Sequence, residues 1–151
     1  MLSLETTITN FKKMKYKTSI NILLGLLIAV ILFHISVIVK AVPYDIAWGG
    51  RLQNDSEMYV FEAISILINL FLGLVLLMKG DYIKFRLKNK TIDIILWIFL
   101  ALFVLNTVGN LFAKTNFEKS FAVLTFVFAI LIWTILKTKN IHDTKNITKT
   151  D

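Results

Sequence analysis

One carboxylate of this chain lies inside a long apolar run. Glu62 falls within residues 59–78, and Arg51 precedes that run in a polar stretch. An ionisable side chain inside a bilayer is costly and is by default a candidate for binding or proton transfer. Near a helix start, however, a carboxylate can also interact with the helix dipole and hydrogen-bond to its neighbours. Glu62 is therefore predicted either as a ligand or proton carrier or as a structural residue, and its charge is left open.

Amides and a hydroxyl in the later apolar runs are predicted to share the external half of the membrane with Glu62, with Asn110 and Thr125 at a similar depth and Asn106 somewhat deeper. Asn106 and Asn110 are one helical turn apart, and Thr125 lies in the last run. Small and hydrogen-bonding residues let membrane helices approach one another, so these side chains are expected to face inward. We predict an outward-facing polar pocket that binds a ligand through Arg51, Glu62, Asn106, Asn110 and Thr125. Arg51 is the nearest counter-charge for Glu62 in the sequence, and Lys114 is another.

The first apolar run has two faces that cannot both point to one bundle axis. Small and polar residues share one face, and His34 lies about 160° away from it at ~100° per residue. Either face would then be available to a second copy of the chain or to a partner membrane protein. The same angle argues against an acid–base pair between His34 and Glu62. The small-residue face consists of Asn21, Gly25, Ala29 and Ser36.

Several kinds of chemistry are not expected. The chain has no cysteine, so it cannot form disulfides, a thiolate nucleophile or a Cys-ligated zinc site. His34 has no second histidine in the apolar runs, because His142 lies in the C-terminal stretch. No serine-hydrolase, zinc-protease or P-loop motif is present. We therefore expect neither a metal nor a cofactor, and no catalytic residue is assigned.

The elements that position these residues follow from composition. The chain is 56% hydrophobic with a mean hydropathy of +0.70, and its apolar runs cover residues 19–39, 59–78, 92–113 and 121–136. About 20 helical residues span the ~30 Å hydrocarbon core, and roughly 17 suffice. We predict an all-α integral membrane protein with four transmembrane helices in an antiparallel up-down bundle. The helices are expected at about 19–40, 57–79, 91–114 and 120–138, with a folded external loop between the first two.

The basic residues predict the orientation. Thirteen of the seventeen Lys and Arg residues flank the runs on one side, and only Lys40, Arg51, Lys114 and Lys119 lie on the other. Loops rich in Lys and Arg stay in the cytoplasm, so both termini are predicted to be cytoplasmic. Residues 1–18 and 139–151 are expected to form polar tails. The basic face suits anionic lipid rather than nucleic acid. Richness in Ile, Lys and Asn suggests a bacterial inner (plasma) membrane protein.

These features predict a small multi-pass membrane protein that acts as a non-enzymatic binding or accessory subunit. One acid and one arginine are sufficient to bind a ligand, but they are a small set of groups for catalysis. An intramembrane enzyme is one alternative, with Glu62 as acid–base and Arg51 holding the head group of a lipid-like substrate. A proton- or ion-coupled component of an oligomeric transporter is another. In a third, the polar groups only join the helices.

Overall fold

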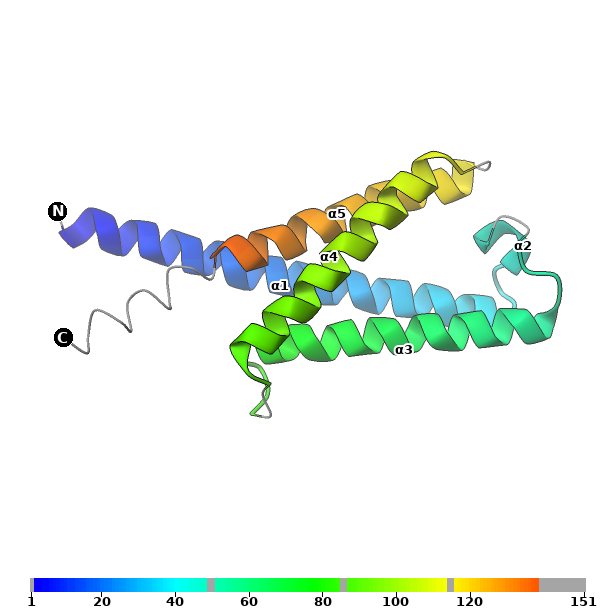
Figure 1. Ribbon diagram of the computed structural model, residues 1–151, viewed down its shortest axis with the longest axis horizontal. Coiled ribbons are helices and arrows are strands. Elements are labelled where there is room, and N and C mark those ends of the chain that lie inside the picture. Colours follow the sequence, from blue (N-terminus) through cyan, green and yellow to red (C-terminus); the bar gives the residue numbers. More distant parts are fainter. Residues whose placement is uncertain (1, 49–50, 85–86, 114–115, 139–151) are drawn as a thin grey trace.

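The computed structural model of this protein describes residues 2–48, 51–84, 87–113 and 116–138 (Figure 1). Within these residues the chain is helical and contains no strand. Four of the helices are long and apolar enough to cross a membrane, which confirms the predicted fold class at that level. The elements are α1 (Leu2–Ile38), α2 (Tyr44–Ala47), α3 (Asp55–Lys79), α4 (Asn89–Leu111) and α5 (Asn116–Thr138).

The first helix is much longer than the apolar run that it contains. α1 begins at Leu2, although a helix is expected only from about residue 19, and the part of it that is apolar enough to cross a membrane is Met14–Ile38. No proline or glycine precedes Gly25, so the sequence offers no residue that would interrupt the helix earlier. At the other end Lys40 adopts a left-handed backbone with φ 60°, a common way to end a helix. The predicted C-terminal tail lies outside the described residues.

The start of α3 carries a side-chain cap. The Asn54 side chain accepts a hydrogen bond from the Glu57 backbone N–H at 2.9 Å, and the Glu57 carboxylate accepts one from the Gln53 N–H at 2.9 Å. The helix begins at Asp55, two residues before the start expected at about residue 57. The helix starts earlier because the pair Asn54 and Glu57 satisfies backbone donors that would otherwise be free at this end.

Replacing this cap gives a first prediction. Asn54→Ala should lower the free energy of unfolding by about 1 kcal/mol, because the Glu57 N–H loses its acceptor. Asn54→Asp keeps an acceptor oxygen at the same position and should retain most of the stability. Thermal unfolding in detergent, followed by far-UV circular dichroism, measures both. Equal losses for the two variants would show that the cap is not what stabilises this end.

The helices diverge from one end of the molecule to the other. α4 packs extensively along α5, and α1 packs along both α3 and α5, whereas α3 and α4 share much less contact. Figure 1 shows α3 and α4 meeting near their connection and separating toward the end where α2 lies. The main core fills the closed end, because that is where all four long helices are near one another. Its fully buried large side chains are Ile20, Leu23, Leu27, Leu72, Leu76, Met78, Ile92, Leu96, Phe128, Ile132 and Ile135.

Polar contacts fasten the closed end. The buried Lys79 ammonium, at the end of α3, pairs with the Asp93 carboxylate of α4. The Tyr16 hydroxyl of α1 donates a 2.7 Å hydrogen bond to the Lys79 backbone carbonyl. The Tyr82 hydroxyl donates to the Asn21 side-chain oxygen, so the α3–α4 connection is tied to α1 as well. We call Tyr16, Asn21, Lys79, Tyr82 and Asp93 the clasp. Within the clasp, the Lys79–Asp93 ion pair joins α3 to α4.

The connection between α1 and α3 folds over the open end. Its Leu52 is buried with Val37 and Met58 in a second, smaller core cluster, and Trp48 packs against that cluster. α2 contacts α5, so the connection reaches across the space between the helices. Lys40 and Asp55 join the ends of α1 and α3 through a 2.6 Å hydrogen bond, which raises the pKa of Lys40 above its usual value. The connection is thus fixed at its base and along its apolar side chains.

Candidate functional site

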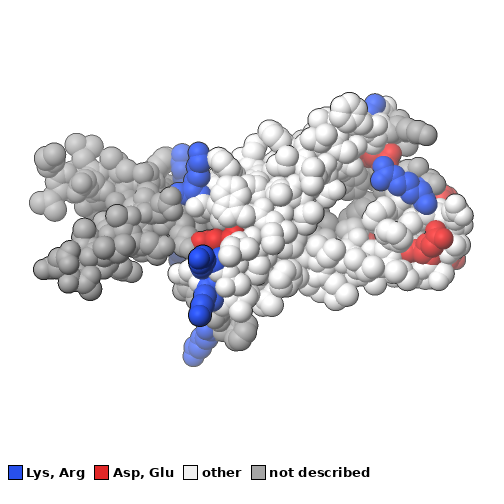
Figure 2. Space-filling model, in the orientation of Figure 1, with Lys and Arg blue, Asp and Glu red and all other residues white. Residues whose placement is uncertain are grey.

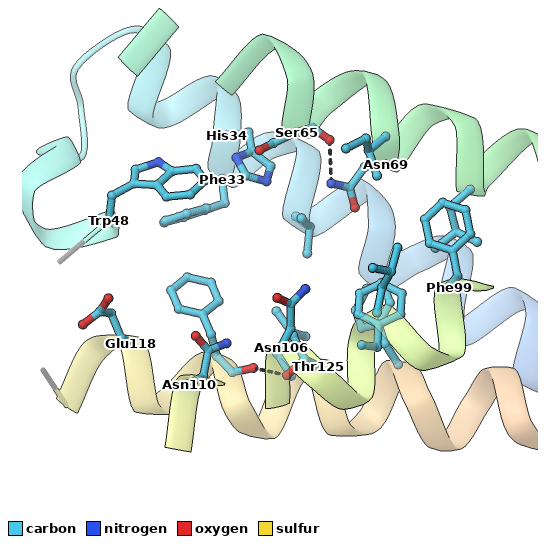
Figure 3. Close-up of a pocket in the computed structure, with 18 of the residues that line it drawn as sticks. Phe33, His34, Trp48, Ser65, Asn69, Phe99, Asn106, Asn110, Glu118 and Thr125 are labelled. Atoms are coloured by element: carbon cyan, nitrogen blue, oxygen red, sulfur yellow. Dashed lines mark hydrogen bonds between the residues drawn. The ribbon is translucent and has the colours of Figure 1, made fainter. Parts of the chain in front are cut away.

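A cavity of about 470 Å³ lies between the diverging helices. Figure 2 shows the surface hollowed at the open end, and Figure 3 shows side chains from α1 and α3 facing those of α4 and α5 across the space. The cavity forms because the core occupies only the closed end. Its lining is Val30, Phe33, His34, Trp48, Arg51, Ser65, Ile68, Asn69, Leu72, Phe99, Leu102, Phe103, Asn106, Asn110, Glu118, Phe121, Leu124, Thr125 and Phe128.

Glu62 is fully buried beside this cavity and holds two of its lining residues. One carboxylate oxygen, Oε1, accepts a hydrogen bond from the Trp48 indole N–H at 2.7 Å. The other, Oε2, lies 2.6 Å from Nδ1 of His34. Both oxygens of this carboxylate are thus engaged by side chains from α1 and the α1–α3 connection. Glu62 does not itself line the cavity, so it positions groups that do.

The expectation that His34 and Glu62 do not meet is wrong. His34 and the small-residue face do lie on opposite sides of α1, as the angle of ~160° requires. The face that points toward the other helices is the one that carries His34, and this brings His34 to Glu62. Ile20, Leu27 and His34 recur every seven residues, the spacing of helices packed side by side. Ile20 and Leu27 are buried against the neighbouring helices, and His34 is largely buried one heptad further on. This spacing is the sequence signal for the inward position of His34.

The small-residue face of α1 has the opposite environment. Asn21, Gly25 and Ala29 are exposed, and a Cβ atom placed on Gly25 would meet nothing within 4 Å. Ser36 is half-buried, and its hydroxyl donates to the Phe33 carbonyl. Of the two faces of α1, the small-residue one is therefore the more exposed, and its contact with the rest of the fold at Asn21 is the hydrogen bond from Tyr82 of the α3–α4 connection.

Arg51 is not the partner of Glu62. Its guanidinium lies 3.5 Å from the Glu118 carboxylate in the first turn of α5, and 69% of its side chain is exposed. The predicted Arg51–Glu62 pairing is wrong because Trp48, three residues earlier in the same connection, occupies the Glu62 carboxylate. Glu118 is 10% exposed, so this acid and Arg51 together form the charged rim of the cavity. Lys114, the other predicted counter-charge, lies outside the described residues.

The structure brings Asn106, Asn110 and Thr125 to the cavity wall opposite His34 (Figure 3). The Thr125 hydroxyl lies 2.9 Å from the Thr107 hydroxyl and donates to the Phe121 carbonyl at 2.9 Å. The amides of Asn106 and Asn110, in contrast, make no hydrogen bond with the described part of the chain. Four of the five predicted site residues thus line one cavity, and Glu62 is linked to it through His34 and Trp48.

Part of the lining has no signal in the sequence. Nothing in the residue pattern selects Trp48 as a site residue, and Glu118 simply flanks an apolar run. Asn69 has the residue type and position of a group that joins two helices, but its side-chain amide donates to the Ser65 carbonyl of its own helix at 2.8 Å. The end of the cavity farthest from Trp48 is aromatic, with the Phe103 ring packed against both Phe99 and Phe128. Aromatic residues in apolar runs give no pattern that separates a cavity wall from a core.

Comparison with known proteins assigns this cavity to no family. The sequence matches no protein-family model and no curated protein, and the structure matches no solved structure. Among the residues that the structure describes, no group of three or more His, Asp or Glu side chains could hold a metal ion. The role of the protein is therefore inferred from the geometry and chemistry of the cavity.

Proposed function

We propose that this chain is a small multi-pass membrane protein that binds a small amphiphilic ligand in the cavity between its diverging helices. The observation that carries this proposal is the cavity itself, about 470 Å³ with a largely apolar wall and a few convergent polar side chains. Small-molecule sites are typically ~300–1,000 Å³ and have this kind of lining. The role is that of a non-enzymatic binding or accessory subunit.

The proposal includes an orientation in the membrane. Figure 2 shows Lys and Arg side chains gathered where α3 ends and α4 begins, and most of the acidic side chains at the opposite end. Positively charged connections remain in the cytoplasm, which supports cytoplasmic termini in an inner (plasma) membrane and an antiparallel up-down path. In this orientation the α1–α3 connection is external and the cavity lies in the outer half of the bilayer.

A second candidate, an intramembrane acid–base enzyme, is favoured by one observation. The 2.6 Å contact of Glu62 with His34 Nδ1 fixes the imidazole, as an orienting carboxylate does for a general base. The substrate-binding role expected for Arg51 has less support, because Arg51 is paired with Glu118. Conversion of membrane lipids by the purified protein, lost in His34→Gln, would favour the enzyme over the binding subunit.

Filling the cavity tests the binding proposal. Native mass spectrometry of the protein, extracted mildly from its own membrane, should show a stoichiometric small-molecule adduct. Ser65→Phe places a ring in the cavity and should weaken ligand binding by roughly tenfold or more, a loss of at least about 1.4 kcal/mol that lowers the amount of adduct.

The matched control is Ala63→Phe, two residues away on the same helix, where the side chain is exposed and does not line the cavity. This variant should keep the adduct. An adduct that survives Ser65→Phe, or a defined complex with another protein and no adduct, would contradict a ligand in this cavity.

A further inference from the structure

We infer that the ligand is an uncharged single-chain amphiphile, whose polar head hydrogen-bonds to His34, Asn106 and Asn110 and whose chain lies along the aromatic end of the cavity. This inference rests on the proposed function and specifies its ligand class. It depends on three observations: which polar groups lack a partner, how the charges are paired, and where the apolar wall lies.

The first observation concerns hydrogen bonds. The Nδ1 atom of His34 is hydrogen-bonded to the Glu62 carboxylate. The other ring nitrogen, Nε2, has no hydrogen bond to the described part of the chain. The same is true of the side-chain amides of Asn106 and Asn110 on the facing helix. An amide offers two donors and an acceptor, and a ring nitrogen offers one of either kind. Leaving such groups without hydrogen-bond partners inside a membrane is costly. A ligand head group with hydroxyls or carbonyls would supply those partners.

These polar groups lie at similar distances from the ends of their helices, so one compact ligand head group can reach all of them. Asn110 is one residue from the end of α4, and Asn106 lies four residues further in, about 6 Å at ~1.5 Å per residue. His34 is likewise four residues from the end of α1. Figure 3 shows His34 on one side of the cavity and the two asparagines on the other. A head placed between them would be within the outer membrane half, below the rim formed by Arg51 and Glu118.

The second observation concerns charge. Among the described residues, the cavity rim carries one cation and one anion, Arg51 and Glu118, whose charged atoms lie 3.5 Å apart. The buried Glu62 carboxylate already receives the Trp48 N–H and contacts His34. The described lining therefore offers an anionic head no cation outside the Arg51–Glu118 pair, and the carboxylates of Glu118 and Glu62 that a cationic head would need are already engaged. Neither sign of head group would recover the cost of burying its charge. An uncharged head suits this wall better than a phosphate or an ammonium.

The third observation concerns shape. Beyond the polar groups the wall consists of Leu72, Phe99, Phe103 and Phe128, which offer apolar surface and no hydrogen-bonding side chain. A volume of about 470 Å³ corresponds to about sixteen groups of water size, at roughly 30 Å³ each. This suits a head with a chain of medium length, and it is too small for a two-chain phospholipid.

Three probes with the same chain length test the inference. Monolaurin is uncharged, dodecanesulfonate is anionic and dodecyltrimethylammonium is cationic. Each is titrated onto the purified full chain in phosphatidylcholine nanodiscs, and the bound adduct is counted by native mass spectrometry. Monolaurin should bind at least about tenfold more tightly than either charged probe. Asn106→Leu and Asn110→Leu should each weaken monolaurin by about fivefold to tenfold, since each removes hydrogen bonds to the head.

Thr134→Val serves as the matched control. It also removes a hydroxyl from α5, but Thr134 does not line the cavity and its hydroxyl donates to the Ile130 carbonyl, so monolaurin affinity should be unchanged. If a charged probe binds as tightly as monolaurin, or if both asparagine variants bind it normally while Ser65→Phe does not, the ligand class is wrong and the cavity proposal stands. If no probe binds and Ser65→Phe has no effect on the natural adduct, the proposed function fails as well.

Discussion

Glu62→Ala is expected to lower the free energy of unfolding by about 3 kcal/mol. The substitution removes both acceptors of a fully buried carboxylate, so the Trp48 indole N–H and His34 Nδ1 lose their partner together. Leaving a buried polar group unsatisfied costs about 1–3 kcal/mol, and two such groups are affected here. Chemical denaturation in mixed micelles, followed by tryptophan fluorescence and circular dichroism, measures the change.

Two further substitutions make this result specific. Glu62→Gln retains an amide oxygen for the Trp48 N–H and an amide nitrogen for His34, so it should keep most of the stability that alanine loses. Asp45→Ala removes an exposed acid at the same end of the molecule and should stay within about 0.5 kcal/mol of the parent. A Glu62→Ala protein as stable as Asp45→Ala would show that the contacts of Glu62 contribute nothing to the fold.

Breaking the ion pair of the clasp is the second large effect. Lys79→Met alone should cost about 3 kcal/mol, because it leaves the Asp93 carboxylate without its buried partner. The Tyr16 hydrogen bond is to the backbone carbonyl at this position, so the substitution leaves that acceptor in place. Asp93→Leu alone should be similarly costly, because Lys79 is only 4% exposed at this position.

The double variant distinguishes coupling from two separate losses. Replacing a buried ion pair by apolar residues of similar volume is often neutral, so Lys79→Met combined with Asp93→Leu should be more stable than either single variant. Unfolding free energies of the parent, the single variants and the double variant give the interaction energy directly. Lys84→Met, on the exposed part of the same connection, is the control. Strictly additive losses would contradict a coupled pair.

The four long helices could be predicted from the sequence because the length and hydropathy of a segment do not depend on its contacts with the rest of the chain. The helix starts could not be placed as well. Residues 2–18 lack both an apolar pattern and a helix-breaking residue, so composition favours a tail where the structure has the first turns of α1. At α3, the cap depends on a reciprocal contact between Asn54 and Glu57, and several neighbouring residues could have taken that position.

The site could be predicted in part for the same reason. Glu62 stands out because it is ionisable within an apolar run, but its partners depend on how α1 rotates against α3 and on the path of the α1–α3 connection. The heptad spacing of Ile20, Leu27 and His34 indicates how α1 is rotated against α3. Nothing in the periodicity of the sequence specifies the path of the α1–α3 connection, and this path brings Trp48 rather than Arg51 to the Glu62 carboxylate.

The divergence of the helices has a mechanical consequence. The clasp and the main core act as a joint at one end, and the helices beyond it are lever arms. α4 has 23 residues, about 35 Å at ~1.5 Å per residue, so a tilt of about 5° about the joint moves its far end by about 3 Å. A force applied in the plane of the bilayer therefore has its greatest mechanical advantage at the mouth of the cavity. A tilt about this joint would therefore change the width of that mouth more than any dimension near the closed end.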